Sequence, residues 1–264
     1  MKLPQKSYIG RHAELYDLFY AEKPYREESE FIHHCLQTYG KDVKNVLELA
    51  CGTGTHALML EKFGYKINAT DYSSDMLDQA QKKGKSSNSR VKFQLKDMRD
   101  LETPQNKWDA VVCLFDSIGY VATNENIQNV LNGVRRQLNP GGLFIFEFWH
   151  AAAMLKNYDP LRVRHWQIPD GEIVRTSETS IDYVSQSCSV LYTIYELMNN
   201  GRYQTIKETQ INRFFLVQEM AQFLKTSNFF PLKWFSGFKK DEAIDSSVWH
   251  IVCVASAQEK EIAE

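Results

Sequence analysis

The stretch LELACGTGTH, residues 47–56, joins a short apolar run to a glycine-rich loop. Gly52, Gly54 and Ala57 fit the G-x-G-x-x-G/A spacing of dinucleotide-binding loops, where a missing side chain lets the backbone approach a ligand. Asp71 follows about 20 residues later, at the distance expected of an acid that binds ribose hydroxyls. This fingerprint predicts an adenosine-containing cofactor, but it does not separate a nicotinamide dinucleotide from other adenosine cofactors.

Short apolar runs alternate with helical patterns between residues 43 and 150, which predicts βαβ units around a buried parallel sheet. The chain is therefore expected to be an α/β protein with an open, doubly wound sheet that binds its ligand beyond the carboxyl ends of the strands. One further helix and two strands are expected to close this core. The core strands are expected at residues 45–50, 65–71, 91–97, 108–116, 143–149, 232–238 and 248–256.

Residues 151–212 have a different pattern, an alternation rich in Thr, Ser, Tyr and Val. This alternation predicts antiparallel strands at residues 172–184, 188–198 and 203–215, and Asn-Asn-Gly at 199–201 is a hairpin-turn signal. We therefore expect a small antiparallel β insert after the fifth core strand. Such an insert can cover the ligand edge of the sheet.

Four acidic residues, Glu48, Asp71, Asp97 and Asp116, stand near the predicted ends of the first four strands. A carboxylate at this edge is a poor neighbour for a pyrophosphate and a favourable one for a cation. S-adenosylmethionine (SAM) carries a sulfonium, an α-ammonium and two ribose hydroxyls. The acidic rim therefore favours SAM over a nicotinamide dinucleotide.

Five segments, in this order and spacing, resemble the successive motifs of class I SAM-dependent methyltransferases: VLELACGTGTH, ATDYSSDML, LKDMRD, WDAVVCLFDSIGY and LNPGGLFIFEF. The resemblance implies a Rossmann-like, seven-stranded sheet and an enzyme that releases S-adenosylhomocysteine (SAH) as product. It also implies one domain, residues 1–264, with a helical lid at 1–42 and a core at 43–150 and 213–264. The β insert at 151–212 would then serve as the substrate cover.

The same motifs imply which residues contact the cofactor. The loop from Ala50 to Gly54 would pass under the methionine part of SAM, Asp71 would accept hydrogen bonds from the ribose, and Asp97 from the adenine amino group. The remaining implied contacts are Glu48 on the acidic rim, Cys51 and Gly52 in the loop, Tyr72 and Met76 against the adenine, the backbone N–H of Met98, Phe115 facing the methyl donor, and Tyr16 and Tyr25, whose rings would shield the sulfonium.

Three further stretches, LYDLFYAEKPYREESEFI, FDSIGY and EFWH, resemble small-molecule N-methyltransferases, most closely those that dimethylate nucleotide-linked amino sugars. That family tends to carry His where this chain has Tyr120, which leaves the acceptor open. Methyl transfer is an in-line displacement, and correct orientation of the two reactants contributes up to roughly 7–11 kcal/mol. The amine must also be neutral, because only the neutral form has a free lone pair for the attack. The candidates for this chemistry are Tyr120, Tyr16 and His150, with Tyr25, Trp149 and Glu147 beside them.

Five cationic side chains in or next to the insert offer partners for a phosphate or carboxylate of the acceptor: Arg162, Arg164, His165, Arg175 and Arg213. A net charge of -2 gives no basic excess for a nucleic-acid partner, so a small-molecule substrate is expected. No apolar run reaches the ~18 residues of a membrane span, and residues 1–14 lack a signal-peptide pattern. The five scattered cysteines predict neither a metal site nor disulfides, and favour the cytoplasm. The oligomeric state stays open between a monomer and a homodimer.

Two other classes of function compete with this hypothesis. Tyr203 and Lys207 have the Y-x-x-x-K spacing of one family of NAD(P)-dependent oxidoreductases, but in a strand four residues extend about 13 Å. A non-catalytic SAM-binding module is the second alternative. Among methyltransferases, O-methylation of a small molecule is one alternative to N-methylation. Methylation of RNA or protein is another, against which stand the acidic balance and FDSIGY in place of an Asn-Pro-Pro-Tyr-like motif after the fourth strand.

Overall fold

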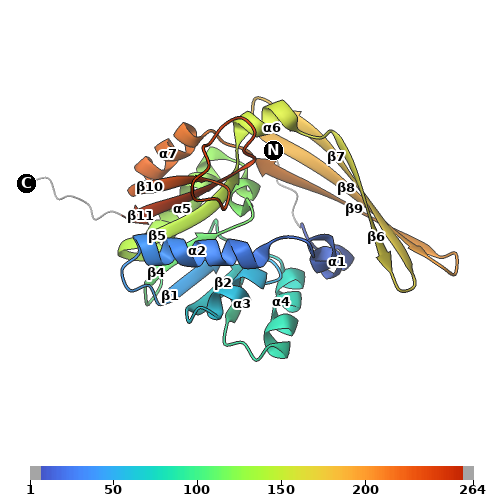
Figure 1. Ribbon diagram of the computed structural model, residues 1–264, viewed down its shortest axis with the longest axis horizontal. Helices are drawn as coiled ribbons and strands as arrows, with labels where there is room; N and C mark the ends of the chain where they lie inside the picture. Colours follow the sequence, from blue (N-terminus) through green and yellow to red (C-terminus); the bar gives the residue numbers. More distant parts are fainter. Residues whose placement is uncertain (1–6, 258–264) are drawn as a thin grey trace, which may run out of the picture.

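The core of the protein, in a computed structural model that describes residues 7–257, is a seven-stranded sheet in the order β10-β11-β5-β4-β1-β2-β3 (Figure 1). β1 to β5 are parallel, and β11 lies antiparallel between β5 and β10. This order confirms the predicted doubly wound α/β sheet. The core strands are β1 (Asn45–Leu49), β2 (Lys66–Asp71), β3 (Lys92–Leu95), β4 (Trp108–Cys113), β5 (Leu138–Trp149), β10 (Phe229–Ser236) and β11 (His250–Ala257).

Helices cover both faces of this sheet, because neighbouring apolar residues of a strand point to opposite faces. On β1, Leu47 and Leu49 belong to one hydrophobic cluster and Val46 to the other. The cluster around Val46 includes residues of α2, α3 and α4, and the cluster around Leu47 includes residues of α5 and α7. These helices are α2 (Tyr25–Tyr39), α3 (Thr55–Glu61), α4 (Ser74–Ser86), α5 (Asn124–Gln137) and α7 (Val217–Thr226).

A second, antiparallel sheet in the order β6-β7-β8-β9 extends from the core as a long arm (Figure 1). It is the insert that the alternating sequence predicts. The expected turn joins β8 to β9, where Gly201 has a φ of 81° and Met198 N donates to Arg202 O at 2.9 Å. The first strand of the arm and the short helix before it, α6 (Ala151–Asn157), are absent from the sequence prediction. The arm consists of β6 (Leu161–Ile168), β7 (Gly171–Asp182), β8 (Ser187–Met198) and β9 (Tyr203–Arg213).

The N-terminal helix α1 (Arg11–Phe19) packs against the arm. Phe19 belongs to the same buried cluster as Ile194 of β8. The guanidinium of Arg11 donates to both carboxylate oxygens of Glu196, at 2.8 Å each. The segment predicted to be a lid is therefore attached to the arm as well as to the core.

The short 3-10 helix η1 (Ser117–Val121) makes the second junction between core and arm. Its Gly119 lies so close to β9 that a Cβ atom would overlap Asn212 Oδ1 and lie 2.6 Å from Arg213 O. Only glycine permits this approach without a shift of the strand. Helices α1 and η1 together hold the arm beside the carboxyl ends of the core strands.

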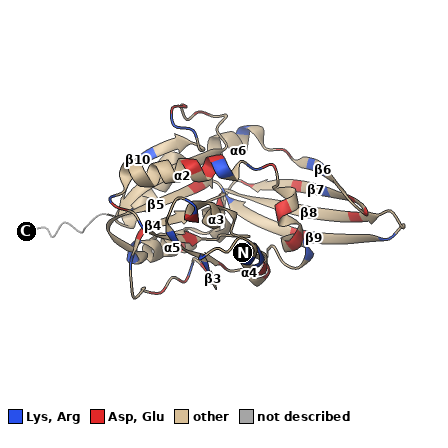
Figure 2. Cartoon of the chain, turned by 60° about the horizontal axis from the view of Figure 1, so that its bottom comes forward, with Lys and Arg blue, Asp and Glu red and all other residues tan. Residues whose placement is uncertain are grey.

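Lys and Arg residues and Asp and Glu residues are interspersed along the chain in Figure 2, in agreement with the net charge of -2. Among the helices of residues 7–257, none combines the length and the apolar character that crossing a membrane requires.

Candidate active site

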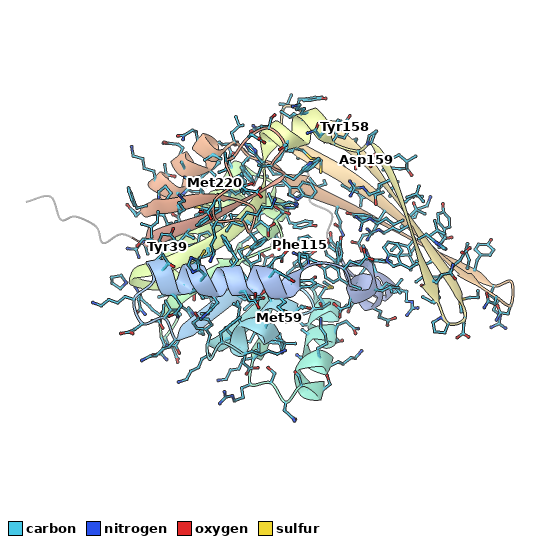
Figure 3. The ribbon with its side chains drawn as sticks, viewed as in Figure 1. Tyr39, Met59, Phe115, Tyr158, Asp159 and Met220 are labelled. Carbon is cyan, nitrogen blue, oxygen red and sulfur yellow. The ribbon has the colours of Figure 1, made fainter. Side chains whose placement is uncertain are left out.

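A cavity of about 1410 Å³ opens at the carboxyl ends of the core strands, with walls from the core, the lid segment and the arm. In Figure 3, Phe115 lies between core and arm, and Tyr158 and Asp159 lie near the start of β6; all three line the cavity. Pockets for one small molecule usually measure about 300–1,000 Å³. This cavity therefore has room for a cofactor and a second small molecule.

The glycine loop is tied to Asp71, the residue predicted to bind the ribose. Gly52 N donates to Asp71 Oδ2 and Ser73 N to Asp71 Oδ1, both at 2.8 Å. Burial raises the pKa of Asp71 above its usual range, although these N–H donors oppose the rise. Gly54 has a φ of 75°, and a Cβ there would lie 2.6 Å from the Phe93 ring. Gly54 thus packs beneath the loop and does not line the cavity, whereas every other predicted cofactor contact does.

Glu48 is a buried carboxylate that the protein itself does not satisfy. Its side chain lies at the end of β1, and its Oε2 has no hydrogen-bond partner among residues 7–257. Burial, reinforced by the nearby charge of Asp71, raises the pKa of Glu48 to about 8. An unpaired carboxylate away from water is costly, and a cationic ligand group relieves that cost. The site therefore fits the α-ammonium of SAM.

The residues predicted to bind the adenine line the cavity at the ends of β2 and β3. Arg99 Nε lies 2.9 Å from both carboxylate oxygens of Asp97, and Arg99 N donates to Asp97 Oδ1 at 2.8 Å. Burial raises the pKa of Asp97, but these bonds outweigh burial and lower it. Asp97 is thus an ionised acceptor shared with Arg99, next to Tyr72, Met76 and Met98 in the cavity lining.

The lid segment contributes aromatic rings and one cation to the cavity. Tyr16 and Tyr25 both line it. Lys23 Nζ lies 4.4 Å from the ring centroid of Phe115 and 5.0 Å from that of Tyr25, and it forms an ion pair with Glu28. Nothing in the sequence singles out Lys23, because these partners come from two separate segments, the start of α2 and the residues after β4.

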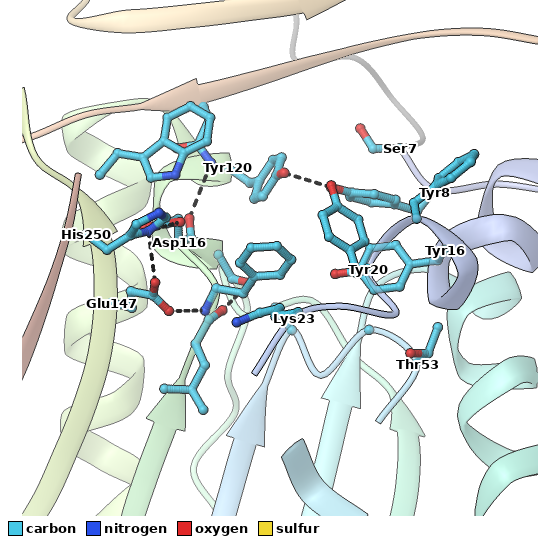
Figure 4. A pocket seen from close by; sticks show the side chains of 18 of the residues that line it. Ser7, Tyr8, Tyr16, Tyr20, Lys23, Thr53, Asp116, Tyr120, Glu147 and His250 are labelled. Atoms are coloured by element: carbon cyan, nitrogen blue, oxygen red, sulfur yellow. Dashed lines mark hydrogen bonds and ion pairs between the residues drawn. The ribbon is translucent and has the colours of Figure 1, made fainter. Parts of the chain in front are cut away.

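Tyr120 lies in a hydroxyl network that crosses the cavity (Figure 4). Its hydroxyl oxygen is 2.8 Å from Tyr8 Oη, and both hydroxyls can donate to Gln210 Oε1, at 3.1 and 2.9 Å. Burial raises the pKa of both tyrosines well above the usual range. Tyr120 is therefore a neutral hydroxyl that can orient a ligand but does not act as a base near neutral pH.

His250 lies between two carboxylates at the ends of β4 and β5 (Figure 4). Its Nδ1 is 2.9 Å from Asp116 Oδ2 and 3.0 Å from Glu147 Oε1. The other oxygen of Glu147 accepts from Phe115 N at 2.7 Å. Phe115 and Asp116 both have a φ of 56°, a left-handed conformation that costs about 1–3 kcal/mol per non-glycine residue. Strained backbone and paired charges thus occur together at this edge.

The pKa values of this cluster follow from burial and mutual attraction. Burial raises the pKa of Asp116 to about 6. Burial alone would lower the pKa of His250, but Asp116 and Glu147 raise it well above its usual range. Burial would raise the pKa of Glu147, but His250 lowers it. Near neutral pH the cluster consists of an imidazolium and two carboxylates.

Only one of two neighbouring histidines lines the cavity. Alternate residues of β5 face it, so that Glu147 and Trp149 line the cavity while Phe148 is in the core. His150, one residue beyond Trp149, lies outside the lining, and its Nδ1 is 3.1 Å from Val248 O. The histidine that lines the cavity is therefore His250 and not the predicted His150. His250 pairs with Trp149 where β11 lies beside β5.

Four of the five cations expected to bind an anionic acceptor group line the cavity. They are Arg162, Arg164, His165 and Arg175. Arg213 is the exception, because it donates to Glu219 Oε1 at 2.6 Å and lies over the Phe215 ring at 5.0 Å. Arg213 fixes the end of β9 instead.

Arg175 is the buried member of this group, with 4% of its surface exposed. Its guanidinium carbon lies 4.6 to 5.2 Å from the ring centroids of Phe19, Trp166 and Tyr192. Its Nε and Nη1 have no hydrogen-bond partner within residues 7–257. Unpaired buried donors of this kind are suited to an anionic ligand group.

The oxidoreductase alternative loses its supporting motif in the structure. Tyr203 and Lys207 lie in β9, and neither lines the cavity. Tyr203 is 75% exposed to solvent. The pair thus does not belong to the site.

Comparison with known proteins identifies the class. Residues 46–142 match a family described as a methyltransferase domain. A solved SAM-dependent methyltransferase from Clostridium acetobutylicum superimposes with a TM-score of 0.81 at 20% identity, over 94% of this chain and 98% of the other. A putative methyltransferase of Bacillus subtilis is 29% identical over 224 residues, 82% of this chain and 84% of the relative. The chain is a SAM-dependent methyltransferase with the class I fold, and SAM is its cofactor.

Amino-sugar enzymes are among its relatives. The dTDP-3-amino-3,4,6-trideoxy-alpha-D-glucopyranose N,N-dimethyltransferase of Streptomyces venezuelae is 34% identical over 143 residues, which span 52% of this chain and 57% of that enzyme. A sugar N-methyltransferase from Streptoalloteichus superimposes with a TM-score of 0.77 at 20% identity, over 98% of this chain and 99% of the other. This second likeness extends through the arm, so the arm is part of the shared fold.

Proposed function

We propose that this enzyme transfers a methyl group from SAM to the amine nitrogen of a small molecule that also carries an anionic group. This proposal rests on one observation, that two parts of the cavity carry opposite charges. The core supplies the buried carboxylates of Asp116 and Glu147, and the arm supplies the unpaired guanidinium of Arg175. An amino group and a phosphate or carboxylate on one acceptor would satisfy both parts.

The cofactor side follows from the residues already described. Glu48 would bind the α-ammonium, Asp71 the ribose hydroxyls, and Asp97 the adenine amino group. Bound SAM supplies an electrophilic methyl group on a sulfonium, so the protein needs only to orient the nucleophile and exclude water. Tyr16 and Phe115 would form aromatic walls around this centre, and the Tyr120 hydroxyl would position the acceptor.

The lid at 1–42 and the insert at 151–212 would act together as the cover of the acceptor. Their described parts are joined by the Arg11–Glu196 pair and by the contact between His12 Nδ1 and Glu208 Oε2 at 3.0 Å. A cytoplasmic location agrees with five free, buried cysteines. A homodimer and the lack of a nucleic-acid partner remain predictions.

The test is methyl transfer from labelled SAM. The first acceptor to try is dTDP-3-amino-3,6-dideoxy-alpha-D-glucopyranose, the substrate named for a relative from Streptomyces fradiae. The same sugar with a hydroxyl in place of the amino group tests O-methylation, and the free amino sugar without the nucleotide tests the anionic group. Labelled product only from the hydroxyl sugar would refute an amine acceptor. Equal kcat/KM for the free and nucleotide-linked amino sugars would refute the role of Arg175.

A further inference from the structure

Asp116 has one carboxylate oxygen fixed and the other free. Oδ2 forms an ion pair with His250 Nδ1 at 2.9 Å, whereas the buried Oδ1 has no hydrogen-bond partner within residues 7–257. Asp116 lines the cavity, and the preceding residue, Phe115, is the one expected to face the methyl donor. We propose that Asp116 Oδ1 binds the ammonium form of the acceptor and takes its proton before methyl transfer. This inference rests on the proposed function.

Other groups around the acceptor position are less suited to this proton. Tyr120 of η1 stays a neutral hydroxyl, and His250 of β11 is already an imidazolium. Glu147 of β5 uses one oxygen for Phe115 N and the other for His250. Lys23 of the lid segment is a cation, and its charge also stabilises the carboxylate of Glu147. Asp116 is therefore a buried carboxylate of the described acceptor side with one oxygen that makes no hydrogen bond to the protein.

The step is a simple proton transfer. An N–H bond of the acceptor ammonium breaks, its electron pair stays on nitrogen as the lone pair, and an O–H bond forms on Asp116 Oδ1. The acceptor becomes the neutral amine that methyl transfer requires, and Asp116 becomes a neutral carboxylic acid. Its burial stabilises that neutral form. His250 and Glu147 act as positioning residues, because they hold Asp116 without contacting the acceptor in this step.

The experiment measures kcat against pH with dTDP-3-amino-3,6-dideoxy-alpha-D-glucopyranose as acceptor. The variants are Asp116→Asn and His250→Gln, and the control is Asp78→Asn, an exposed acid on α4. SAH affinity, measured by calorimetry, checks that the cofactor side is intact. General-base catalysis contributes about 10²–10⁴-fold, so Asp116→Asn is expected to lower kcat by that factor near pH 7. At higher pH the acceptor arrives neutral, and kcat of this variant should recover at least tenfold.

His250→Gln tests the same role while keeping the carboxylate. Loss of the imidazolium charge should raise the pKa of Asp116, so the acidic limb of the kcat profile should move to higher pH. An unmoved limb would overturn the proposal, and so would wild-type kcat in Asp116→Asn, or a loss in that variant that high pH does not restore. If Asp116→Asn does not fold, the dependence of kcat on pH in His250→Gln decides whether Asp116 takes the proton.

Two results would separate this inference from the proposed function. If the wild-type enzyme binds SAH and methylates no amine, the proposed function fails and the proton-transfer role fails with it. If the wild-type enzyme methylates the amine and Asp116→Asn does so equally well, only the role of Asp116 fails. Loss of activity with EDTA and recovery with Mg²⁺ would instead place a metal ion between Asp116, Glu147 and His250, and would also overturn it.

Discussion

Glu48 gives the affinity for SAM a dependence on pH that can be worked out from the structure. Its pKa is raised to about 8, first by burial and second by Asp71. An α-ammonium binds the ionised carboxylate, so below this pKa each binding event must also remove one proton from Glu48. The dissociation constant should therefore fall tenfold for each pH unit gained, because one proton is released on binding. The rise in affinity from about pH 5.5 to about pH 7.0 is then about 30-fold.

The assay is calorimetric titration of the enzyme with SAH, which carries the same α-ammonium and is chemically more stable. The upper limit of about pH 7 keeps that ammonium protonated, because free α-amino groups have pKa values near 7.7–8.0. Glu48→Gln should bind more weakly at pH 7 and show little dependence on pH. Glu125→Gln, an exposed acid on α5, should retain the wild-type slope. A flat wild-type profile, or the same slope in Glu48→Gln, would refute the assignment of Glu48 to the ammonium.

The same pKa shift affects the stability of the ligand-free enzyme. The pKa of Glu48 is higher in the folded state, about 8, than the ordinary value of 4.5. The folded state therefore retains a proton that the unfolded chain has lost, and stability falls as pH rises from about 4.5 to about 8. The slope is about 1.4 kcal/mol per pH unit for one proton. Urea denaturation should show wild type losing stability relative to Glu48→Gln across this range, and a constant difference would contradict the shift.

Three substitutions test other parts of the site. Asp71→Ala should weaken SAH binding by ~1.5–3 kcal/mol, because it removes a charged hydrogen-bond acceptor. It should also lower the Tm, because Gly52 N and Ser73 N lose their partner. An unchanged affinity in calorimetry would contradict the assignment of Asp71 to the ribose. Tyr120→Phe should leave SAH affinity nearly intact and lower kcat, since its hydroxyl bonds Tyr8 and Gln210 rather than the cofactor side; an unchanged kcat excludes the hydroxyl from acceptor positioning. Arg175→Met should raise KM for the dTDP-linked amino sugar by at least tenfold, as expected for loss of a charged hydrogen bond of about 1.5–3 kcal/mol, with SAH affinity unchanged; an unchanged KM excludes an anionic acceptor group at this position.

The central strands of the core, β1, β4, β5 and β11, could be predicted from sequence because they are largely buried and appear as continuous apolar runs. The arm shows where that signal ends. β7 and β8 alternate more and less buried residues, and both agree with the predicted segments to within two residues at each end. β6 is an edge strand whose residues are mostly exposed, so its sequence LRVRHWQI has no apolar face that would distinguish it from a loop.

The two sides of the cavity differ in the same way. The cofactor side is built from the ends of successive strands, so the order of motifs along the chain was enough to predict Glu48, Asp71 and Asp97 at one edge. The acceptor side combines Tyr8, Arg175 and His250 with that edge, and these residues are far apart in sequence. Their proximity depends on pairings between strands that periodicity does not specify. The predicted His150 is the clearest case, because it follows β5 directly and lies outside the cavity lining, whereas Trp149, one residue earlier, lines the cavity.

Part of the energetic cost of this fold lies where ligands are expected. Phe115 and Asp116 hold left-handed backbone, as does Ala50 with a φ of 51°, and all three line the cavity. The unpaired buried oxygen of Glu48 and the unpaired donors of Arg175 lie in the same lining. Each of these groups destabilises the ligand-free protein, and a cationic cofactor and an anionic acceptor group would relieve the electrostatic part. Cofactor and acceptor should therefore each raise the Tm, and their effects should be separable, because Glu48 belongs to the core and Arg175 to the arm.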